Sequence, residues 1–543
     1  MGRFCGSATS PTGGAAIFRV TNPLTGAEMA TEFQSISAGD LDRACWKAWE
    51  AFHAMRDRSH IDRAGLLDAI ATRIAGLGDA LTSIACAETG LSAVKVVGER
   101  ERVVGNLHEL AARLRAGAWL SAHIEPAEPS RRPTPKPDLR SMRIGLGPVL
   151  ALGCGPAPLL TGPAGTDAAC ALAAGCPVIC KSHPERAATD EMVAWAIVQA
   201  LEAEGFHPAT IALLHAGGAR EGAIVERLVK HSCVRAVTMA GARESVEFVG
   251  RLCALRPDPI PLFAIIGSTN PVFALPGAVG ASQEDLANRL FSAVTSTGGQ
   301  SCLRPGLLFL ERGGESEGLL QRLGVAFNAA RPQPMVSRRA RRRYGARLAE
   351  VMRLSGVDLI GGSVQADHGA DPGGAETGPV MASCALLRTS LSVFKKSALL
   401  HEQISGPALV VIMCRDGAEM VEGAGALQGS LSGTIWLATR DAPTARRLTS
   451  ALERRVGRII FNGTSLGLEF TPASVHTGPF PAATRAELSA YGPDAPLRFL
   501  RPVCYQNAPD ALLPRELRAA NPLGVRRRRN GLIEPAPRPA EAA

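Results

Sequence analysis

The segment Gly299–Gly306, with the sequence GQSCLRPG, holds the residue types that nucleophilic catalysis needs. Cys302 follows a glycine-rich turn, and Arg304 lies two residues further along the chain. A nearby cation can lower the pKa of a thiol and favour the thiolate, which is the nucleophilic form. An isolated cysteine is more often a small buried residue of the core. The segment by itself therefore leaves a catalytic and a structural interpretation open.

The remaining cysteines do not form a pattern typical of metal binding. Thirteen cysteines extend from Cys5 to Cys504 without a CxxC pair, and no histidine cluster has the spacing of metal ligands. We therefore expect no metal site, and we expect Cys176 and Cys180 to pack in the core. Unpatterned cysteines without an apolar secretory segment at the N-terminus favour a reducing compartment, the cytoplasm.

The basic character of the chain does not indicate a nucleic-acid or membrane partner. The formal charge is +9, and its densest runs are Arg338–Arg343 and Arg526–Arg529. No aromatic residues interleave with these runs, so a solvated helix face and a polar C-terminal end explain them. Residues 144–166 are uncharged, but ten of these 23 residues are Gly or Pro. We expect a buried strand and a turn there, and no membrane span.

Hydrophobic periodicity predicts the elements that position Cys302. The first third is helical in pattern, with a helix start at Ser37–Asp40. From residue 147 short apolar runs alternate with helical segments, which indicates βαβ units and a parallel sheet. Ligands of such sheets bind at the carboxyl ends of the strands, although no GxGxxG motif follows any of these runs. The runs are Val149–Leu152, Pro177–Cys180, Ile211–Leu214, Ala236–Met239 and Leu262–Ile266, with later strand-like runs at Gly406–Met413 and Arg458–Phe461.

Several motifs resemble those of the aldehyde dehydrogenase superfamily, whose nucleophile loop reads Gly-Gln-x-Cys followed by Pro-Gly. The resemblance covers most of the chain without large gaps. It includes TNPLTG at 21–26, ETGL at 88–91, GER at 98–100, PKPDLR at 135–140, AAGCPV at 173–178 before Lys181, PIP at 259–261, GSTNP at 267–271, FNG at 461–463 and HTGPFPA at 476–482. The run RFLRPVCYQN at 498–507, continuing through DALLP to NPLG at 521–524, is similar to the branch that acts on 2-oxoglutarate semialdehyde.

The resemblance implies an α/β fold with a parallel-sheet cofactor domain, an α/β catalytic domain and a small bridging β element. We expect the cofactor domain at 1–126 and 147–268, the catalytic domain at 269–470, the bridging element at 127–146 and 471–510, and a C-terminal tail at 511–543. In this family the bridging element extends the sheet of a neighbouring subunit, which implies a homo-oligomer, a dimer or larger.

The resemblance also implies a reaction. Cys302 would attack an aldehyde, NAD+ or NADP+ would accept a hydride, and water would release a carboxylate from the thioester on Cys302. Such chemistry needs a base and donors for the oxyanion. Ile265 stands where the family has its general-base Glu, and Pro156 where it has its oxyanion Asn. Only the backbone N–H of Cys302 is left as a donor in this prediction.

The expected cofactor site is altered as well. Lys181 matches the family lysine that reaches the adenosine ribose, and Gly241 opens the turn that would hold pyrophosphate, with Ala242 replacing a serine. The motif for the nicotinamide ribose reads Gln403 to Pro407, without its usual Glu and Phe, and Glu402 is adjacent. We expect weakened NAD or NADP binding.

Two functions remain open from the sequence. The first is an NAD(P)+-dependent dehydrogenase of a small-molecule aldehyde, 2-oxoglutarate semialdehyde among the candidates. The alternative is a catalytically impaired member that acts as a structural or assembly partner. A weaker third interpretation is a thiol-dependent activity without cofactor.

Overall fold

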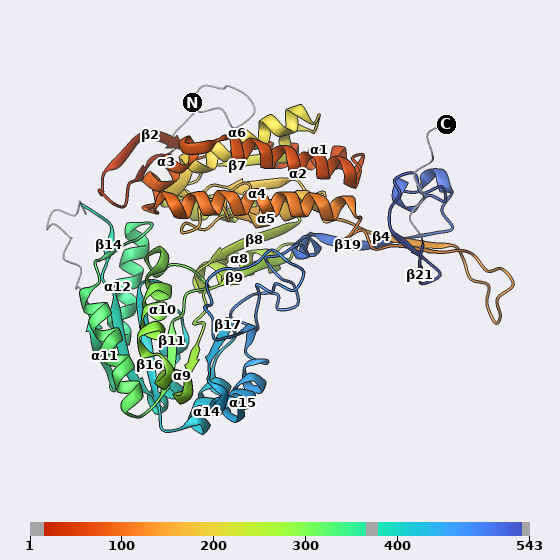
Figure 1. Ribbon diagram of the computed structural model, residues 1–543. Coiled ribbons are helices and arrows are strands. Elements are labelled where there is room, and N and C mark those ends of the chain that lie inside the picture. The colour runs from red at the N-terminus through yellow and green to blue at the C-terminus, as the bar shows by residue number, and fades with distance from the viewer. Residues whose placement is uncertain (1–15, 365–377, 535–543) are drawn as a thin grey trace.

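The computed structural model describes residues 16–364 and 378–534. Figure 1 shows two stacked halves and a slender arm that projects from their junction. The upper half contains the N-terminal helices, and the lower half contains most elements after residue 270. The mixed helices and parallel sheets confirm the predicted α/β fold class.

The sheet of the upper half is fully parallel and has the strand order β7-β6-β5-β8-β9. The chain passes outward from β5 to β7 and then returns to start again on the other side of β5. Such a reversal creates a crevice at the carboxyl ends of the two central strands, here β5 and β8, where ligands of open α/β sheets bind. The strands are β5 (Val149–Leu152), β6 (Val178–Lys181), β7 (Ile211–Leu214), β8 (Ala236–Gly241) and β9 (Leu262–Ile266).

Helices cover this sheet on both sides, and the predicted helix start is confirmed. The side chain of Ser37 accepts a hydrogen bond from the backbone of Asp40 and caps α1. Cys176 and Cys180 are buried in the core, as the sequence predicts. The helices are α1 (Ala38–Arg56), α2 (His60–Gly76), α3 (Gly78–Thr89), α4 (Ala93–Arg115), α5 (Thr166–Ala173), α6 (Ala187–Ala203), α7 (Glu221–Lys230) and α8 (Arg243–Ala254), and a hairpin of β1 (Ile17–Thr21) and β2 (Glu28–Gln34) lies at their edge.

The lower half is built on a seven-stranded sheet with the order β13-β15-β16-β11-β10-β17-β18, in which only the β13–β15 pair is antiparallel. Its strands are β10 (Val272–Ala274), β11 (Leu307–Glu311), β13 (Val357–Gly362), β15 (Ala385–Ser390), β16 (Ala408–Cys414), β17 (Ser430–Trp436) and β18 (Val456–Phe461). The helices are α9 (Pro276–Ala281), α10 (Gln283–Thr295), α11 (Gly314–Ala329), α12 (Arg338–Met352), α13 (Leu391–Lys396), α14 (Gly417–Ala426) and α15 (Ala442–Leu452), and β12 (Gln333–Pro334) pairs with β14 (Met381–Ala382).

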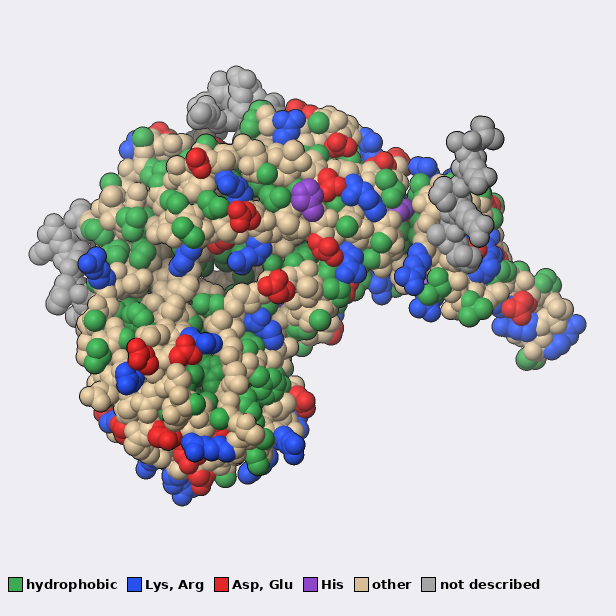
Figure 2. Space-filling view, in the orientation of Figure 1, with side chains coloured by type: hydrophobic (Ala, Val, Ile, Leu, Met, Phe, Trp, Pro, Cys, Tyr) green, Lys and Arg blue, Asp and Glu red, His purple; other side chains and the backbone are tan. Residues whose placement is uncertain are grey.

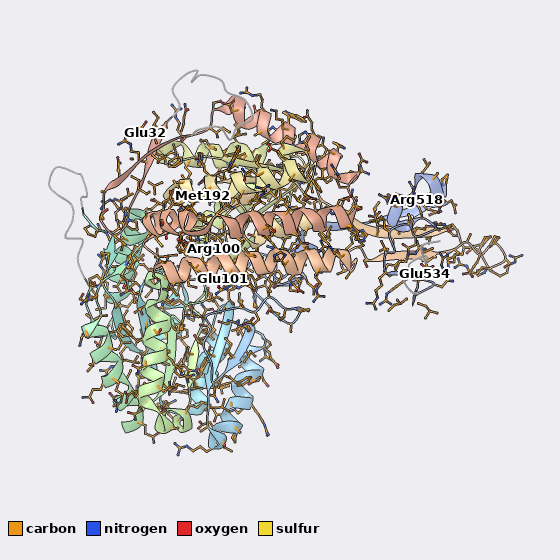
Figure 3. The ribbon with its side chains drawn as sticks, turned by 45° about the horizontal axis from the view of Figure 1, so that its top comes forward. Glu32, Arg100, Glu101, Met192, Arg518 and Glu534 are labelled. Atoms are coloured by element: carbon orange, nitrogen blue, oxygen red, sulfur yellow. The ribbon has the colours of Figure 1, made fainter. Side chains whose placement is uncertain are left out.

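The arm is a third sheet, and it differs from the bridging element that the sequence predicts. Its order is β19-β4-β3-β20-β21, from β3 (Ala122–Glu125), β4 (Leu139–Gly145), β19 (Leu500–Gln506), β20 (Arg527–Arg529) and β21 (Leu532–Ile533). The sheet thus starts before residue 127 and includes part of the expected tail. The interpretation of Arg526–Arg529 as a polar C-terminal end holds for Arg526 and Arg528, which are exposed, but not for Arg527, which is buried and pairs with Glu534. Figure 3 shows Arg518 and Glu534 on this arm.

No single helix in the described residues is long and apolar enough to cross a membrane; α2 and α3 meet that requirement only as a pair bent by 76°. On the face of the main body that Figure 2 shows, acidic and basic side chains are interspersed rather than gathered in one basic stripe.

Candidate active site

Cys302 lies in a tight loop between α10 and β11, where the two halves meet. Thr297, Gly298 and Gly299 have φ angles of 56°, 61° and 68°, which glycine adopts freely but other residues rarely do. A Cβ atom on Gly299 would lie 2.3 Å from the backbone of Gly406. The glycines of the motif are therefore needed for the turn and for close packing of two backbones.

Asn270 fixes the loop from the other side. Its Nδ2 donates hydrogen bonds to the carbonyl oxygen of Cys302 at 2.7 Å and to that of Arg304 at 2.8 Å. Its Oδ1 accepts from the hydroxyls of Ser268 and Ser432 at 2.9 and 3.0 Å. Asn270 is only 1% exposed, so all four partners form one buried network that holds the Cys302 backbone.

Arg304 does not activate the thiol, and the prediction that it does is wrong. Its guanidinium is fully buried and donates to the carbonyl oxygens of Pro305, Ile404 and Ala408. Burial raises the pKa of the Cys302 thiol to about 12, because desolvation disfavours the thiolate. The thiol is therefore neutral at rest.

An apolar wall faces Cys302 where the resemblance places a carboxylate. Ile265 lies on β9, is 7% exposed, and forms a cluster with Leu431, Ala482 and Ala483 against which Cys302 packs. Its backbone is fixed by pairing with Ala240 of β8 and by a bridge to Ala483. Ile265 and Cys302 thus belong to one apolar cluster, which contains no carboxylate among its members.

His476 is a site residue that the sequence did not single out. Its Nε2 lies 3.9 Å from Sγ of Cys302. Burial and the charges of Arg458 and Arg498 lower the pKa of His476 to about 4, although Asp167 opposes this. The imidazole is therefore neutral at neutral pH. The HTGPFPA motif resembles a motif of the family, but nothing in its spacing indicates that its histidine lies beside the thiol.

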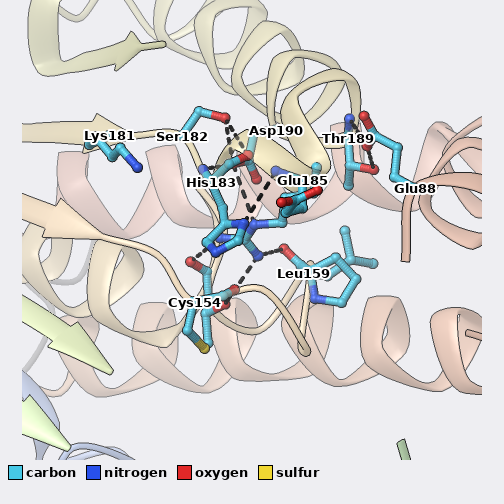
Figure 4. A network of polar contacts seen from close by, with 12 residues as sticks. Glu88, Cys154, Leu159, Lys181, Ser182, His183, Glu185, Thr189 and Asp190 are labelled. Atoms are coloured by element: carbon cyan, nitrogen blue, oxygen red, sulfur yellow. Dashed lines mark hydrogen bonds and ion pairs between the residues drawn. The ribbon is translucent and has the colours of Figure 1, made fainter. Parts of the chain in front are cut away.

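The loop that follows β5 contains Pro156 and is held by Arg186. Figure 4 shows Cys154 and Leu159 of this loop in a polar network with Asp190. Arg186 is 1% exposed, and its guanidinium donates to the carbonyl oxygens of Pro158 at 2.5 Å and Thr161 at 2.8 Å. Asp190 lies 3.5 Å from its Nε. Pro156 and Gln300 of the Cys302 loop both line a cavity of about 190 Å³. The loop thus reaches the nucleophile segment, but proline brings neither an N–H nor an amide to it.

Two features at the strand ends fit a nucleotide. Lys181 ends β6, is 6% exposed, and pairs with Glu221 of α7; burial lowers the pKa of its ammonium group. Gly241 ends β8, and Ala242 is the N-cap residue before α8, where it offers no side-chain hydrogen bond. The first N–H groups of that helix therefore keep their capacity to bind an anion such as pyrophosphate.

Gln403 is turned toward the Cys302 loop. Its Oε1 accepts from the backbone of Ser268 at 3.1 Å, and its Nε2 donates to the carbonyl oxygen of Ser301 at 3.3 Å. Glu402 does not take its place, because it forms ion pairs with Arg347 and, at 3.8 Å, with Arg243. The amide of Gln403 thus links the loop before β10 to the Cys302 loop before β11.

The predicted solvated face on α12 agrees with the structure, in which Arg339, Arg342 and Arg343 are exposed. No group of three or more His, Cys, Asp and Glu within residues 16–364 and 378–534 could hold a metal ion.

Comparisons with known proteins agree with this geometry. A model described as the aldehyde dehydrogenase family matches residues 10–473. The chain is 37% identical to alpha-ketoglutaric semialdehyde dehydrogenase 2 of Azospirillum brasilense over 97% of this chain and 98% of the relative. It is 35% identical to alpha-ketoglutaric semialdehyde dehydrogenase of Acinetobacter baylyi over 92% and 93%.

Solved structures show the same fold at lower identity. An aldehyde dehydrogenase from Bacillus cereus in complex with NAD+ has a TM-score of 0.74 at 19% identity and covers 90% of this chain and 93% of its own. Glyceraldehyde-3-phosphate dehydrogenase of Methanocaldococcus jannaschii, complexed with NADP, has a TM-score of 0.73 at 16% identity and covers 90% and 98%.

Proposed function

The chain belongs to the aldehyde dehydrogenase family, and from that premise we propose that it oxidises a dicarboxylic semialdehyde to the carboxylate with NAD+ or NADP+. 2-Oxoglutarate semialdehyde is the first candidate, because the two relatives described above carry that substrate in their names and match this chain over nearly their full length. The observation that carries the proposal is the position of Cys302, which is fixed by Asn270 at the junction of the two halves.

Cys302 is the nucleophile in this reaction. Its Sγ bonds to the aldehyde carbon, and the carbonyl oxygen takes the electron pair. The backbone N–H of Cys302 is the donor that this chain offers to that oxygen, since Pro156 offers none. Ile265 and its apolar neighbours exclude water from one side of the sulfur. Loss of the hydrogen on the former aldehyde carbon as a hydride leaves a thioester on Cys302, and water then hydrolyses that thioester to the carboxylate and the thiol.

The residues present fit a nicotinamide nucleotide at its phosphate and adenosine end. The uncapped start of α8 at Ala242 lies beside the crevice between β5 and β8, and the buried ammonium of Lys181 lies at the end of the neighbouring strand β6. When bound, the nucleotide supplies the hydride acceptor. The amide of Gln403, engaged by Ser268 and Ser301, offers no carboxylate to the second ribose, so we expect the nucleotide to be held less tightly there.

We also propose a homo-oligomer in the cytoplasm. The outer edge of β19 on the arm and the outer edge of β18 are unpaired in the described chain, and unpaired edges are templates for strand addition. A second subunit would cover both. Twelve described cysteines are free thiols, which suits a reducing compartment.

The alternative of an impaired structural partner rests on Ile265 and Pro156. It is not favoured, because both curated relatives are named as dehydrogenases.

The test is an assay of the purified chain with a panel of semialdehydes and each nucleotide, followed by the absorbance of the reduced nicotinamide. We expect turnover of a five-carbon dicarboxylic semialdehyde and none by Cys302→Ser. Inactivity of the full panel with both nucleotides would contradict the proposal.

A further inference from the structure

The thiol of Cys302 has one hydrogen-bonding side chain within reach among the described residues. That side chain is His476, with its Nε2 at 3.9 Å from Sγ. Ile265 and the apolar cluster occupy the face where a carboxylate is expected. His476 is therefore the side-chain proton acceptor that the described residues offer to the thiol, whose other titratable neighbour is the thiol of Cys154.

The backbone around His476 is held on both sides. Its N–H donates to Oγ of Ser489 at 2.9 Å, and its carbonyl oxygen accepts from the N–H of Ala490 at 2.9 Å. Ser489 in turn donates to the carbonyl oxygen of Tyr491 at 2.6 Å. These bonds fix the ring beside the sulfur, and they connect the site to a segment 187 residues beyond Cys302.

The ring itself is available as an acceptor. Nδ1 of His476 is buried without a hydrogen-bond partner in the described residues, so no neighbouring group forces a tautomer that would put the proton on Nε2. The lowered pKa keeps the ring neutral. A neutral imidazole can accept a proton, whereas an imidazolium cannot.

We propose that His476 is the base that takes the proton of Cys302 as the sulfur attacks the aldehyde carbon, in place of the carboxylate that Ile265 replaces. The inference rests on the proposed function for the identity of the electrophile. The S–H bond breaks and its proton moves to Nε2, the S–C bond forms, and the C=O electron pair moves to oxygen. The imidazolium can return the proton to that oxygen or to solvent.

The resting pair is a neutral thiol beside a neutral imidazole. Burial raises the pKa of Cys302 to about 12 and lowers that of His476 to about 4. The charged groups that face His476 are Arg458, Arg498 and Asp167. A preformed ion pair is thus disfavoured, and proton transfer must accompany attack on the electrophile. Proton transfer during the attack predicts a pH profile for the reactivity of Cys302 that a merely structural histidine would not give.

Alkylation of Cys302 by iodoacetamide tests the inference without any aldehyde or nucleotide, read by mass spectrometry of the Cys302 peptide. In the wild-type protein, the reactive thiol–imidazole pair keeps one protonation state across pH 6–9. We expect its alkylation rate to stay nearly flat there. A thiol that reacts only as the thiolate would gain about tenfold per pH unit. We expect that slope in His476→Gln and in His476→Asn, with a rate at pH 7 at least about tenfold below wild type.

His108→Gln is the matched control, because His108 lies on the exposed surface of α4 beside Asp68. It should keep the flat profile and the wild-type rate. A tenfold rise per pH unit in the wild-type protein would overturn the inference, and this measurement requires no variant to fold. A His476→Gln rate within about twofold of wild type would also overturn it.

The same variants separate this inference from the proposed function. If the His476 variants lose the flat alkylation profile while no semialdehyde is oxidised, the role of His476 as the base is supported and the proposed dehydrogenase reaction is contradicted. If the dehydrogenase reaction is present and His476→Gln lowers its kcat/KM by less than about tenfold, the proposed reaction is supported and the role of His476 as the base is contradicted, since a general base contributes ~10²–10⁴-fold.

Discussion

Ile265→Glu places a carboxyl group beside Cys302 in a wall that is now apolar. The replaced side chain is 7% exposed among Leu431, Ala482 and Ala483, so the new carboxylate is poorly solvated and its pKa is raised. In a His476→Gln background, which leaves Cys302 without a base, we expect the substitution to raise kcat/KM by ~10²-fold. In the wild-type background the gain should be smaller, because one base already serves the thiol and such effects do not multiply.

The pH dependence follows from the raised pKa. Only the carboxylate accepts a proton, so the gain should increase from pH 6 to pH 9. Loss of a buried aliphatic side chain costs about 1.5–3 kcal/mol, and each unit by which the pKa is raised costs about 1.4 kcal/mol once the group ionises. The folded-state pKa lies above the unfolded value of about 4.3. The free energy of unfolding should therefore decrease further as the pH rises from about 4.3 to the folded-state pKa.

Steady-state kinetics over pH 6–9 and urea unfolding at pH 5 and 8 measure both effects. Ile265→Gln is the control, because it has the same shape and no proton acceptor of comparable strength. Adding Cys302→Ala should abolish the gain. Equal activity of the Glu and Gln variants, or equal gains with and without His476, would refute the reasoning.

Five further predictions concern the neighbouring groups. Pro156→Asn should raise turnover by at least ~10-fold, because it returns one donor to the oxyanion, whereas Pro156→Ala should not. Lys181→Met should weaken nucleotide binding about tenfold in calorimetry, as expected for the loss of one charge-assisted hydrogen bond. The Kd of the wild-type protein for either nucleotide should exceed ~1 μM, because the amide of Gln403 is engaged by Ser268 and Ser301. A tighter wild-type Kd would contradict the account. Asn270→Ala should lower the free energy of unfolding by at least about 2 kcal/mol, since it leaves two buried carbonyls without donors; an unchanged urea midpoint would refute this. The folded-state pKa of His476 is about 4, below the ordinary value of about 6.5. The free energy of unfolding of the wild-type protein should therefore decrease between pH 6.5 and 4, by up to about 3 kcal/mol, and that of His476→Gln should decrease less. Parallel curves of unfolding free energy against pH for the two proteins would exclude this contribution of His476.

Local patterns were enough to predict the central sheet, whereas the place of Ile265 in the site comes from the family resemblance. The apolar run Leu262–Ile266 forms β9 as predicted. The alternation of apolar runs and helical segments likewise predicted that the upper sheet is parallel, although it did not give the order of the strands. The position of Ile265 follows from the GSTNP motif beside it, which resembles the motif that follows the family's general-base Glu.

Contacts between distant segments could not be predicted in this way. His476 reaches Cys302 across 174 residues, and only the folded chain brings them together. Arg304 is near Cys302 in sequence, yet its side chain turns to the carbonyls of Ile404 and Ala408, because buried guanidinium N–H groups need carbonyl acceptors. Arg527–Arg529 lacks strand propensity, but pairing with β3 makes it a strand.

The thioester on Cys302 is the central claim, and it can be trapped directly. The purified protein is mixed with 2-oxoglutarate semialdehyde and an excess of NAD+ or NADP+, quenched in acid within the first turnover, and digested for mass spectrometry. We expect an acyl adduct on the Cys302 peptide that forms together with reduced nicotinamide and that hydroxylamine removes. Reduced nicotinamide without any adduct on Cys302, or neither product with both nucleotides, would contradict the account.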